Sequence, residues 1–570
     1  MAYENFYEGS KSDLDPGTDS LYTGATMPQG SIGATTGAQT ANQIQDVANY
    51  LNQGMKVIEL SVIQPDVFEM IPKQHFKEIN RLTKITGAET TLHAPMIEAS
   101  GFTQQGWSEQ GREASERQFK DVIFRAHELS PDKPMPVTIH ASVMSGSETM
   151  PANMIKNLTP EEKAEYGNNI PTMMVAINQE TGQPQGLIRE EEYETEKKEA
   201  ELWTPEKRLK SINSTDWINA LTNLEFYKKE ADESIAQGAG ADPMRAQLFL
   251  NHIESSFRGI YHKARKYGDP EAQKVLDDVS NSWKENAEMT KGLEPDLQVA
   301  VRSKLIGDSI HKLANIKPPE VFKKVETFAI EKASDTFSNV AVEAYKKFGS
   351  TAPIISIENP PYSQALSTAE DLKKLVEVSR NKFAEKISKE KGIPLSEAKN
   401  LAKNAIGVTW DTSHISMIRK QGYEGEELIE QAKKIAPFVK HVHLNDNFGT
   451  THTDLPPGMG TAELGNVIKE LQKKGYKGKA VFEGGQFFNQ FKRAPHVEVI
   501  EAMGSPMYSA VAEPTWRNSY GTVGTYSSGY GNFLPEQHFS MYGGGFSGLP
   551  TELGGAVSGR QSRLSGTPMN

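Results

Sequence analysis

The chain has 570 residues, a formal net charge of −12 and no cysteine. The absence of cysteine excludes disulfides and thiolate ligands, so any bound metal must be held by His, Asp and Glu. The acidic charge argues against a protein that coats nucleic acid. A mean hydropathy of −0.55 and the lack of a long apolar run lead us to expect no transmembrane helix and no membrane partner.

The chain begins with a polar segment, residues 1–28, which we expect to be flexible and which lacks the pattern of a secretory signal. We therefore expect a cytoplasmic protein. Short apolar runs then predict strands at 31–34, at 57–62, up to His93 and at 137–140. Helices are predicted between them, at about 40–51, 76–85 and 113–129. Such alternation is typical of parallel βα units.

The alternation stops after His140 and resumes only near residue 354. The intervening chain is charged and predicts helices at 190–212, 215–237, 243–267, 270–291 and 319–348. Asn213 to Asp216 resemble a group of helix N-caps, and Pro318-Pro319 resemble a helix start. We therefore predict a helical insertion domain over residues 145–333.

The second part of the chain repeats the pattern, with strands predicted at 354–358, 406–411, 439–444 and 479–483. Helices are predicted between them at 369–389, 425–435 and 461–474. Eight strands in all predict an α/β fold, a (β/α)8 TIM barrel formed by residues 29–144 and 334–492, with the insertion between strands four and five. Residues 493–570, rich in Gly, Ser and Tyr, predict a flexible tail.

Metal-binding residue types stand where the predicted strands end, which is the functional end of such a barrel. Imidazole and carboxylate ligands suit zinc or manganese. The candidate ligands are His93, His140, Glu358, Asp411, His414, His443, His452, Asp454 and Glu483. Nearby His441, Asn445 and Asp446 are predicted to orient ligands or support the structure. Glu59 is interpreted as either a cavity-lining group or a core salt-bridge partner.

This ordered set resembles endonuclease IV, the second family of apurinic/apyrimidinic endonucleases in the xylose-isomerase-like barrel superfamily, over about residues 30–142 and 350–490. The resemblance implies three zinc ions in the barrel mouth. His93 and His140 match ligands of the first ion, and Glu358 bridges it to the second. The remaining ligands of the second ion are matched by Asp411, His443 and Glu483. His414 matches one ligand of the third.

Two departures from that family concern the third ion and the DNA. The family's Asp-x-His pair reads His452-Thr453-Asp454, with the order inverted. Met96 and Ile97 stand where the DNA-wedging residues follow the first histidine, and neither has an aromatic ring.

The resemblance implies a zinc-dependent phosphodiesterase with two or three Zn²⁺, or Mn²⁺ in their place, acting on a phosphoester such as damaged DNA in repair. Glu358, as the bridge, and Glu483, which would also orient the nucleophile, are the predicted catalytic residues. One alternative is a sugar isomerase or epimerase of the same superfamily, which needs only Glu358, Asp411, His443 and Glu483. His93, His140 and His414 argue for the hydrolase, because a one-metal isomerase has no evident use for them. A non-catalytic barrel with a structural or interaction role is the third alternative.

Overall fold

The computed structural model describes residues 31–52, 54–151, 155, 171–193, 200–236, 243–457 and 460–484. The predicted flexible segment 1–28 and tail 493–570 lie outside these ranges. Two compact units make up the chain, one formed by residues 1–170 and 326–570 and the other by residues 171–325. In the described part, no helix has the length and apolar character needed to cross a membrane.

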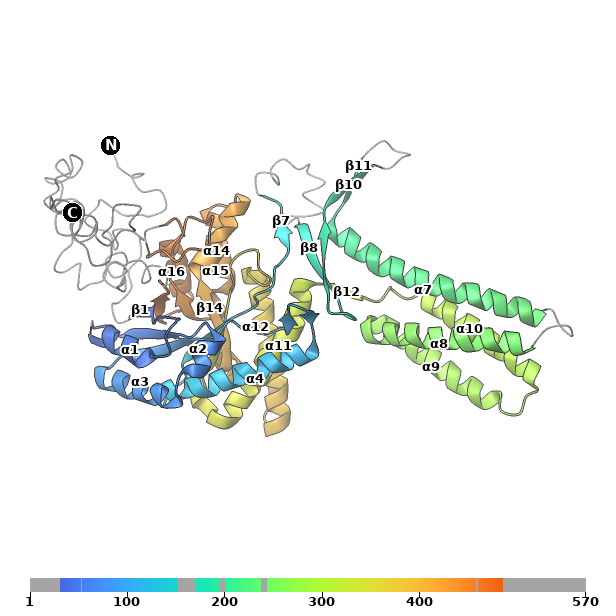
Figure 1. Cartoon of the computed structure of the whole chain (residues 1–570), viewed down its shortest axis with the longest axis horizontal. Helices are drawn as coiled ribbons and strands as arrows, with labels where there is room; N and C mark the ends of the chain where they lie inside the picture. The colour runs from blue at the N-terminus through green and yellow to red at the C-terminus, as the bar shows by residue number, and fades with distance from the viewer. Residues whose placement is uncertain are drawn as a thin grey trace, which may run out of the picture. The chain divides into compact units, whose positions relative to one another are not determined.

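The first unit contains a closed barrel of eight parallel strands, which confirms the predicted (β/α)8 fold (Figure 1). Around the barrel the strands follow the order β1-β16-β15-β14-β13-β6-β3-β2. Their bounds are Ile32–Thr35 (β1), Val57–Ser61 (β2), Glu89–His93 (β3), Pro136–His140 (β6), Ile354–Glu358 (β13), Ile406–Asp411 (β14), Val439–His443 (β15) and Ala480–Phe482 (β16). Nearly every residue of these strands is buried, which explains their continuous apolar runs.

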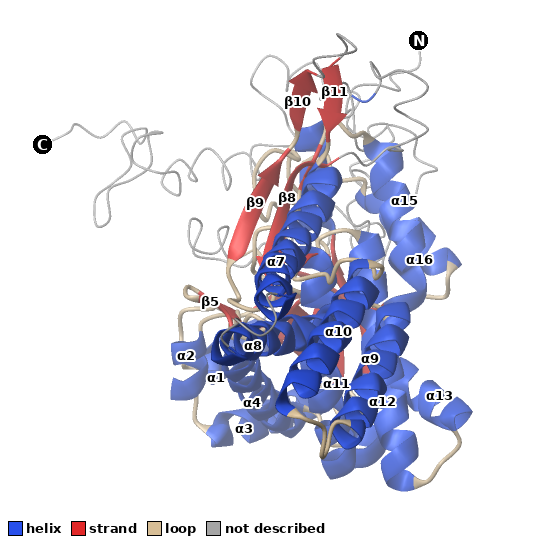
Figure 2. Ribbon diagram, turned by 90° about the vertical axis from the view of Figure 1, so that its right-hand side faces the viewer, coloured by secondary structure: helices blue, strands red, loops and turns tan. Residues whose placement is uncertain are grey.

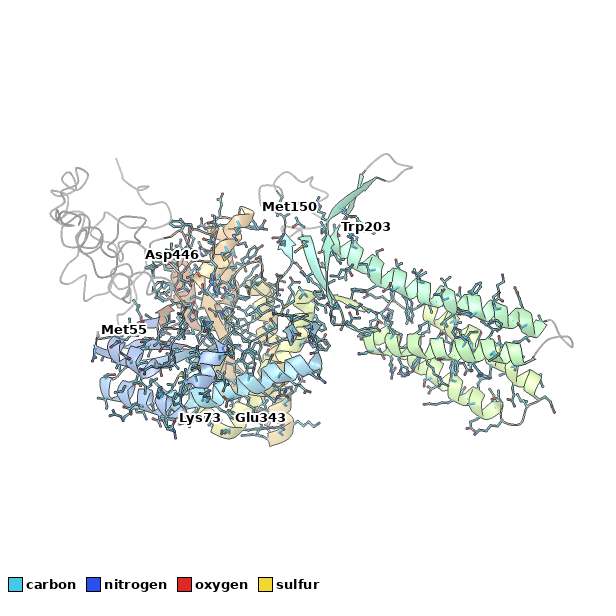
Figure 3. All side chains as sticks on the ribbon, in the orientation of Figure 1. Met55, Lys73, Met150, Trp203, Glu343 and Asp446 are labelled. Carbon is cyan, nitrogen blue, oxygen red and sulfur yellow. The ribbon has the colours of Figure 1, made fainter. Side chains whose placement is uncertain are left out.

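Helices cover the outside of the barrel (Figure 2), and Figure 3 shows the side chains of both layers. The helices are α1 (Gln43–Asn52), α2 (Pro65–Met70), α3 (Lys73–Thr86), α4 (Glu109–Ala126), α11 (Val325–Phe348), α12 (Ala369–Lys391), α13 (Leu395–Ala405), α15 (Gly425–Ile435) and α16 (Leu464–Lys473). The short, fully buried α14 (Thr412–Ser416) instead follows β14 directly, at the C-terminal end of the barrel. Short 3-10 helices lie at His127–Leu129, Gly349–Thr351, Met417–Gln421 and Ala436–Phe438. The amphipathic α16 buries Leu464, Val467, Ile468 and Leu471.

Two further small elements of the first unit are the hairpin β4 (Phe102–Thr103) and β5 (Gly106–Trp107), and the short β7 (Glu148–Thr149). The hairpin follows the loop after β3. Trp107 Nε1 donates to Ser100 O at 2.8 Å, so the hairpin is fastened to that loop.

The second unit follows β7 in the chain and extends to Val325, the first residue of α11, so it is inserted between the fourth and fifth barrel strands. Four helices lie side by side in it (Figure 1): α7 (Pro205–Ala236), α8 (Pro243–Tyr267), α9 (Pro270–Met289) and α10 (Pro295–Ala314). Their buried side chains, including Trp217, Phe257 and Leu276, form a core of their own.

Strands also occur in the second unit, within the region that the sequence predicted to be a helical insertion domain. They are β8 (Pro171–Asn178), β9 (Pro184–Ile188), β10 (Glu190–Tyr193), β11 (Ala200–Trp203) and β12 (Phe322–Lys324). Strand β8 pairs antiparallel with both β9 and β12, and β10 pairs with β11. The predicted helix 190–212 is therefore wrong for its first half, because pairing between strands overrides the helix-favouring composition.

The predicted N-cap group at Asn213 is also wrong, since Asn213 lies inside the single helix α7. Its side chain faces the edge of β12 instead. Asn213 Nδ2 donates to Phe322 O at 2.9 Å, and Phe322 N donates to Asn213 Oδ1 at 2.8 Å. The amide thus completes the backbone hydrogen bonds of a short strand, which a sequence pattern does not distinguish from a cap.

Candidate metal centre

All nine predicted ligands lie at or just beyond the C-terminal ends of barrel strands. His93, His140, Glu358, Asp411 and His443 are the last residues of β3, β6, β13, β14 and β15. Glu483 follows β16, His414 lies in α14, and His452 and Asp454 lie in the loop between β15 and α16. The register of the strands places these ligands side by side: His140 pairs with Glu358, and Asp411 pairs with His443.

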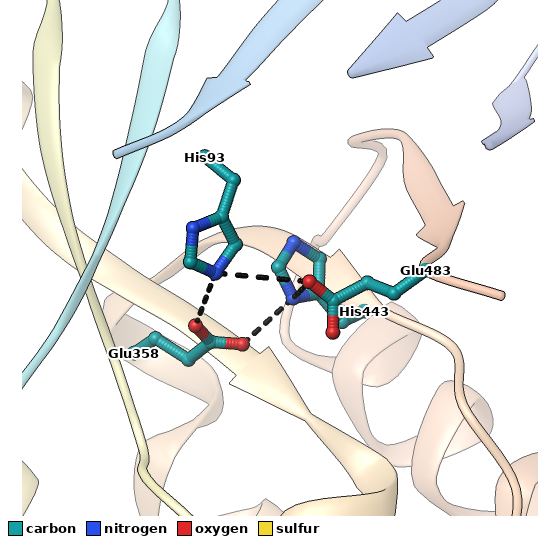
Figure 4. Close-up of side chains that lie close together, drawn as sticks. All are labelled: His93, Glu358, His443 and Glu483. Atoms are coloured by element: carbon teal, nitrogen blue, oxygen red, sulfur yellow. Dashed lines mark hydrogen bonds and ion pairs between the residues drawn. The ribbon is translucent and has the colours of Figure 1, made fainter. Parts of the chain in front are cut away.

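The Glu358 carboxylate faces two different sets of imidazoles, one with each oxygen (Figure 4). Its Oε2 lies 3.2 Å from His93 Nε2 and 3.1 Å from His140 Nε2. Its Oε1 lies 2.7 Å from His443 Nδ1. A carboxylate whose two oxygens point to separate nitrogen ligands has the arrangement of a bridge between two cations.

Two asparagines hold Asp411 and Glu483, the acidic residues beside His443. Asn445 Nδ2 donates to Asp411 Oδ2 at 2.6 Å and to Glu483 Oε2 at 2.9 Å. Asn359 Oδ1 accepts from Asp411 N at 2.8 Å. Glu483 Oε1 is thereby left facing His93 Nε2 at 3.7 Å and His443 Nδ1 at 3.4 Å (Figure 4). His443 Nδ1 also lies 3.8 Å from Asp411 Oδ2, so the four predicted ligands of the second ion converge.

The third set consists of His414, His452 and Asp454. His414 Nε2 lies 2.9 Å from His452 Nε2, and His452 Nε2 lies 3.8 Å from Asp454 Oδ1. His414 also offers a ligand atom within 4.8 Å of one from Glu358 and one from Asp411. The three residues therefore meet despite the inverted order in the sequence, at a more open position where the His452 side chain is 45% exposed.

Backbone carbonyls select which nitrogen of two histidines is available. His93 Nδ1 lies 2.9 Å from Ala94 O, and His414 Nδ1 lies 2.7 Å from Asn359 O. Because a carbonyl oxygen can only accept, Nδ1 carries the hydrogen in both rings. In the neutral ring the lone pair is then on Nε2, the atom that faces the centre. This is the usual orientation of a metal-binding histidine.

The charges at the centre are balanced by imidazoles alone. No lysine or arginine among the described residues forms an ion pair with the carboxylates of Glu358, Asp411, Glu483 or Asp454. Burial lowers the pKa of His93, but its hydrogen bond to Glu358 and the nearby carboxylates outweigh this and raise that pKa to about 9. A proton on His93 therefore supplies positive charge at the position where a metal ion would supply it.

Burial shifts the pKa values of Glu483 and His140 in opposite directions. Burial raises the pKa of Glu483 to about 8, with Glu358 and Asp411 adding to the effect against the opposing charges of His443 and His93. Burial lowers the pKa of His140 to about 3, although the charge of Glu358 opposes it. An imidazole that stays neutral, beside carboxylates of excess charge, fits a site for divalent metal ions.

The sequence left the roles of Glu59 and His441 open, and the structure joins them. His441 Nε2 lies 3.0 Å from Glu59 Oε2, which also accepts from Thr91 Oγ1 at 2.7 Å. Glu59 Oε1 lies 2.9 Å from His443 Nε2, on the side of that ring away from Glu358. A lone Glu in an apolar strand was the only signal of this contact in the sequence.

Asp446, which the sequence predicted to orient the histidines, holds the loop that carries His452 and Asp454. Its Oδ1 accepts from Asn447 N and Ala462 N, each at 2.9 Å, and its Oδ2 accepts from Gly460 N at 2.9 Å. The carboxylate thus draws the two ends of the loop together.

Glu98, which the sequence analysis did not single out, joins the loops that follow His93 and His140. Its Oε2 accepts from Ser142 Oγ at 2.8 Å and Val143 N at 2.7 Å, and its Oε1 accepts from Ser100 N at 3.0 Å. None of these donors belongs to a candidate ligand, so Glu98 fixes the loops that follow two ligands through neutral groups.

Residues 395–494 match the sequence profile of a family described as xylose isomerase-like TIM barrel. This range contains Asp411, His414, His443, His452, Asp454 and Glu483. The match supports the xylose-isomerase-like superfamily, whose members are enzymes, and does not single out endonuclease IV. A search among curated protein sequences gave no match.

The solved structures that resemble the chain include the following three. A D-tagatose 3-epimerase-like protein has 13% identity and a TM-score of 0.36, with 82% of this chain and 98% of that chain covered. D-Psicose 3-epimerase from Clostridium cellulolyticum H10, solved with D-tagatose, has 9% identity and a TM-score of 0.35, with 80% and 84% covered. The 3-keto-D-glucoside 4-epimerase from E. coli has 10% identity and a TM-score of 0.33, with 80% and 91% covered. Values this low carry no information on activity.

Proposed function

We propose that the chain is a metal-dependent phosphoester hydrolase with two or three divalent ions, zinc in the first place, at the C-terminal end of its barrel. The observation that carries the proposal is the division of Glu358 between two sets of imidazoles, one on each oxygen. Paired ions held by a shared carboxylate are typical of enzymes that cleave phosphoesters.

The residues fall into three ligand groups. His93, His140 and Glu358 Oε2 would hold one ion, and Glu358 Oε1, Asp411, His443 Nδ1 and Glu483 a second. His414, His452 and Asp454 would hold a third. The ions, when bound, supply a water of lowered pKa and stabilise charge on the leaving oxygen.

The protein's own contribution is orientation and proton transfer. Asn445 holds Glu483 by its Oε2, so Oε1 remains directed into the centre. From there Glu483 can orient the attacking water and accept its proton. The exposure of His452 supports entry of the substrate phosphate on the side of the third group.

For the substrate, we propose a phosphoester whose cleavage needs no wedge in duplex DNA. Ile97, in the stretch that would carry the wedge, is only 8% exposed. A buried side chain does not reach between bases. Damaged DNA is therefore one test substrate among others.

A sugar isomerase or epimerase is the second candidate, because Glu358, Asp411 and Glu483 all approach His443 Nδ1, within 3.8 Å. This quartet alone could hold the single ion that proton transfer next to a carbonyl requires. The proposal for the hydrolase rests on the five remaining imidazole and carboxylate ligands, which the isomerase leaves without a role.

Metal content and activity together test the proposal. The purified chain is stripped with chelator, reloaded with Zn²⁺ or Mn²⁺ and analysed by mass spectrometry of its metals. It is then assayed with bis-p-nitrophenyl phosphate, an abasic-site duplex and a panel of ketoses. We expect two or three zinc ions and cleavage of the phosphodiester, abolished in Glu358→Gln and unchanged in His262→Ala, an exposed histidine of α8. One ion per chain with ketose turnover would support the second candidate, and a chain without metal affinity would contradict both.

A further inference from the structure

We infer that Glu59, held by Thr91 and His441, is a positioning residue that fixes which nitrogen of His443 binds metal. The inference rests on the proposed metal centre and adds a residue to it that binds neither metal nor substrate. Glu59 lies in the middle of β2, where its side chain points into the barrel, fully buried at 0% exposure.

The two oxygens of Glu59 serve different partners. Oε2 accepts from Thr91 Oγ1 at 2.7 Å and lies 3.0 Å from His441 Nε2. Thr91 is the residue paired with Glu59 on the neighbouring strand β3, so the barrel register itself sets this contact. Oε1 is left for His443 Nε2, at 2.9 Å. The carboxylate is therefore fixed through Oε2, and Oε1, which has no hydrogen-bond partner among the described residues, lies beside His443 Nε2.

His443 lies between two carboxylate groups, and its chemistry forces a choice between them. Its Nδ1 faces Glu358, Glu483 and Asp411, whereas its Nε2 faces Glu59. A neutral imidazole has one lone pair and one N–H, so it can bind a cation with only one of its nitrogens.

A metal ion held by Glu59, His441 and His443 is the competing interpretation, since these residues also offer ligand atoms within 4.8 Å of one another. It would require the lone pair of His443 on Nε2. That would remove His443 from Glu358, Asp411 and Glu483, which together offer three carboxylates at Nδ1. The larger ligand set decides the matter: the hydrogen belongs on Nε2 beside Glu59, and the lone pair on Nδ1. This is the carboxylate–histidine–metal arrangement.

Replacing Glu59 by glutamine tests the inference with little change in size. Thr91 and His441 already occupy one oxygen, so the amide nitrogen of Gln would face His443 Nε2. That nitrogen can only donate, and it would favour the ring with its hydrogen on Nδ1, where the ion binds. We expect Glu59→Gln to weaken metal binding by about 10- to 100-fold, the usual effect of losing such a partner.

The measurements use the full-length chain. Zinc affinity is measured by competition with a chromophoric chelator, stoichiometry by metal analysis at saturation, and ligand geometry by the visible spectrum of the Co²⁺-loaded protein. The wild type should bind two or three ions. Glu59→Gln should reach the same stoichiometry at higher free metal, with an altered Co²⁺ spectrum and an unchanged far-UV circular dichroism spectrum.

A matched pair of variants covers the case in which Glu59→Gln fails to fold. Thr91→Val removes the hydroxyl that fixes Glu59. Thr409→Val removes another buried barrel hydroxyl, which among the described residues bonds to Thr138 and Ser356 and to no candidate ligand. Thr91→Val should weaken zinc binding and shift the Co²⁺ spectrum, and Thr409→Val should do neither.

Three results would overturn the inference. Unchanged affinity and spectrum in Glu59→Gln would show that Glu59 does not act on His443. The same conclusion follows if the two threonine variants behave alike. Loss of one ion at saturation in Glu59→Gln would make Glu59 a ligand rather than a positioning residue. A wild-type chain that binds no metal would instead contradict the proposed function itself.

Discussion

His414 Nε2 and His452 Nε2 face each other at 2.9 Å across 38 positions of the chain. His414 directs this nitrogen by donating from Nδ1 to Asn359 O, and the loop of His452 is closed by Asp446. The order of His452 and Asp454 along the loop is therefore secondary, because the loop bends both toward the same histidine.

Loss of Glu358 should release more metal than loss of His452. Glu358→Ala removes contacts to His93, His140 and His443, whereas His452→Ala removes one exposed ligand of the third group. Metal analysis after dialysis should show at least two ions lost from Glu358→Ala and at most one from His452→Ala. Equal losses from both variants would contradict the bridging role of Glu358.

Metal binding should be coupled to proton release. The pKa of His93 is raised to about 9, above the ordinary value of 6.5, because its ion pairs outweigh its burial. Below pH 9 the metal-free ring carries a proton that an ion must displace, so zinc affinity should rise from about pH 6.5 to pH 9. Calorimetry in buffers of different ionisation enthalpy measures the protons released per ion.

The same pKa predicts the opposite trend for the metal-free chain. Because the pKa of His93 is higher in the folded chain than in the unfolded chain, protonation of His93 stabilises the fold. This contribution is complete below pH 6.5 and is lost as the pH rises through about 9. Thermal unfolding of chelator-treated protein should therefore fall in midpoint over this range. A midpoint that rises with pH, or an affinity that is flat, would show that His93 is not protonated in the metal-free state.

Asn445 should be needed to hold Asp411 and Glu483 together. Asn445→Ala removes the amide that donates to both carboxylates and the oxygen that accepts from Glu483 N. The loss of buried hydrogen bonds should cost about 1–3 kcal/mol of unfolding free energy. Chemical denaturation of the metal-free chain measures it. Asn466→Ala in α16 is the control and should change little, because among the described residues this side chain bonds only to Glu463, the residue before the helix.

The hydrogen bonds between Asn213 of α7 and Phe322 can be tested in the second unit. Asn213→Ala leaves the N–H and C=O of Phe322 without their partner, at a cost of about 1–3 kcal/mol. Hydrogen exchange at Phe322–Lys324, followed by mass spectrometry, should accelerate. Asn223→Ala, at an exposed position of the same helix, should leave that exchange unchanged, because alanine favours the helix and nothing is unpaired. Equal exchange in both variants would contradict the role of Asn213.

The sequence predicted the barrel and the convergence of the ligands because both follow from local patterns. Short apolar runs gave the eight strands, and parallel strands bring their C-terminal ends to one side, which placed His93 beside Glu358. What it missed depends on partners that are distant along the chain. The pairing of β10 with β11, the role of Asn213 and the contact between Glu59 and His443 each require the fold to be known first.

The pairing of β1 with β16 has a consequence for the newly made chain. Thr35 Oγ1 donates to Glu483 O at 2.6 Å, across 448 positions. Ribosomes add about 5–20 residues per second, so β1 waits roughly 20 to 90 seconds for its partner with one edge uncovered. Such an edge invites pairing with other chains until it is closed. Because Glu483 arrives with that last strand, the proposed second ion could meet its full set of ligands only after synthesis has passed residue 483.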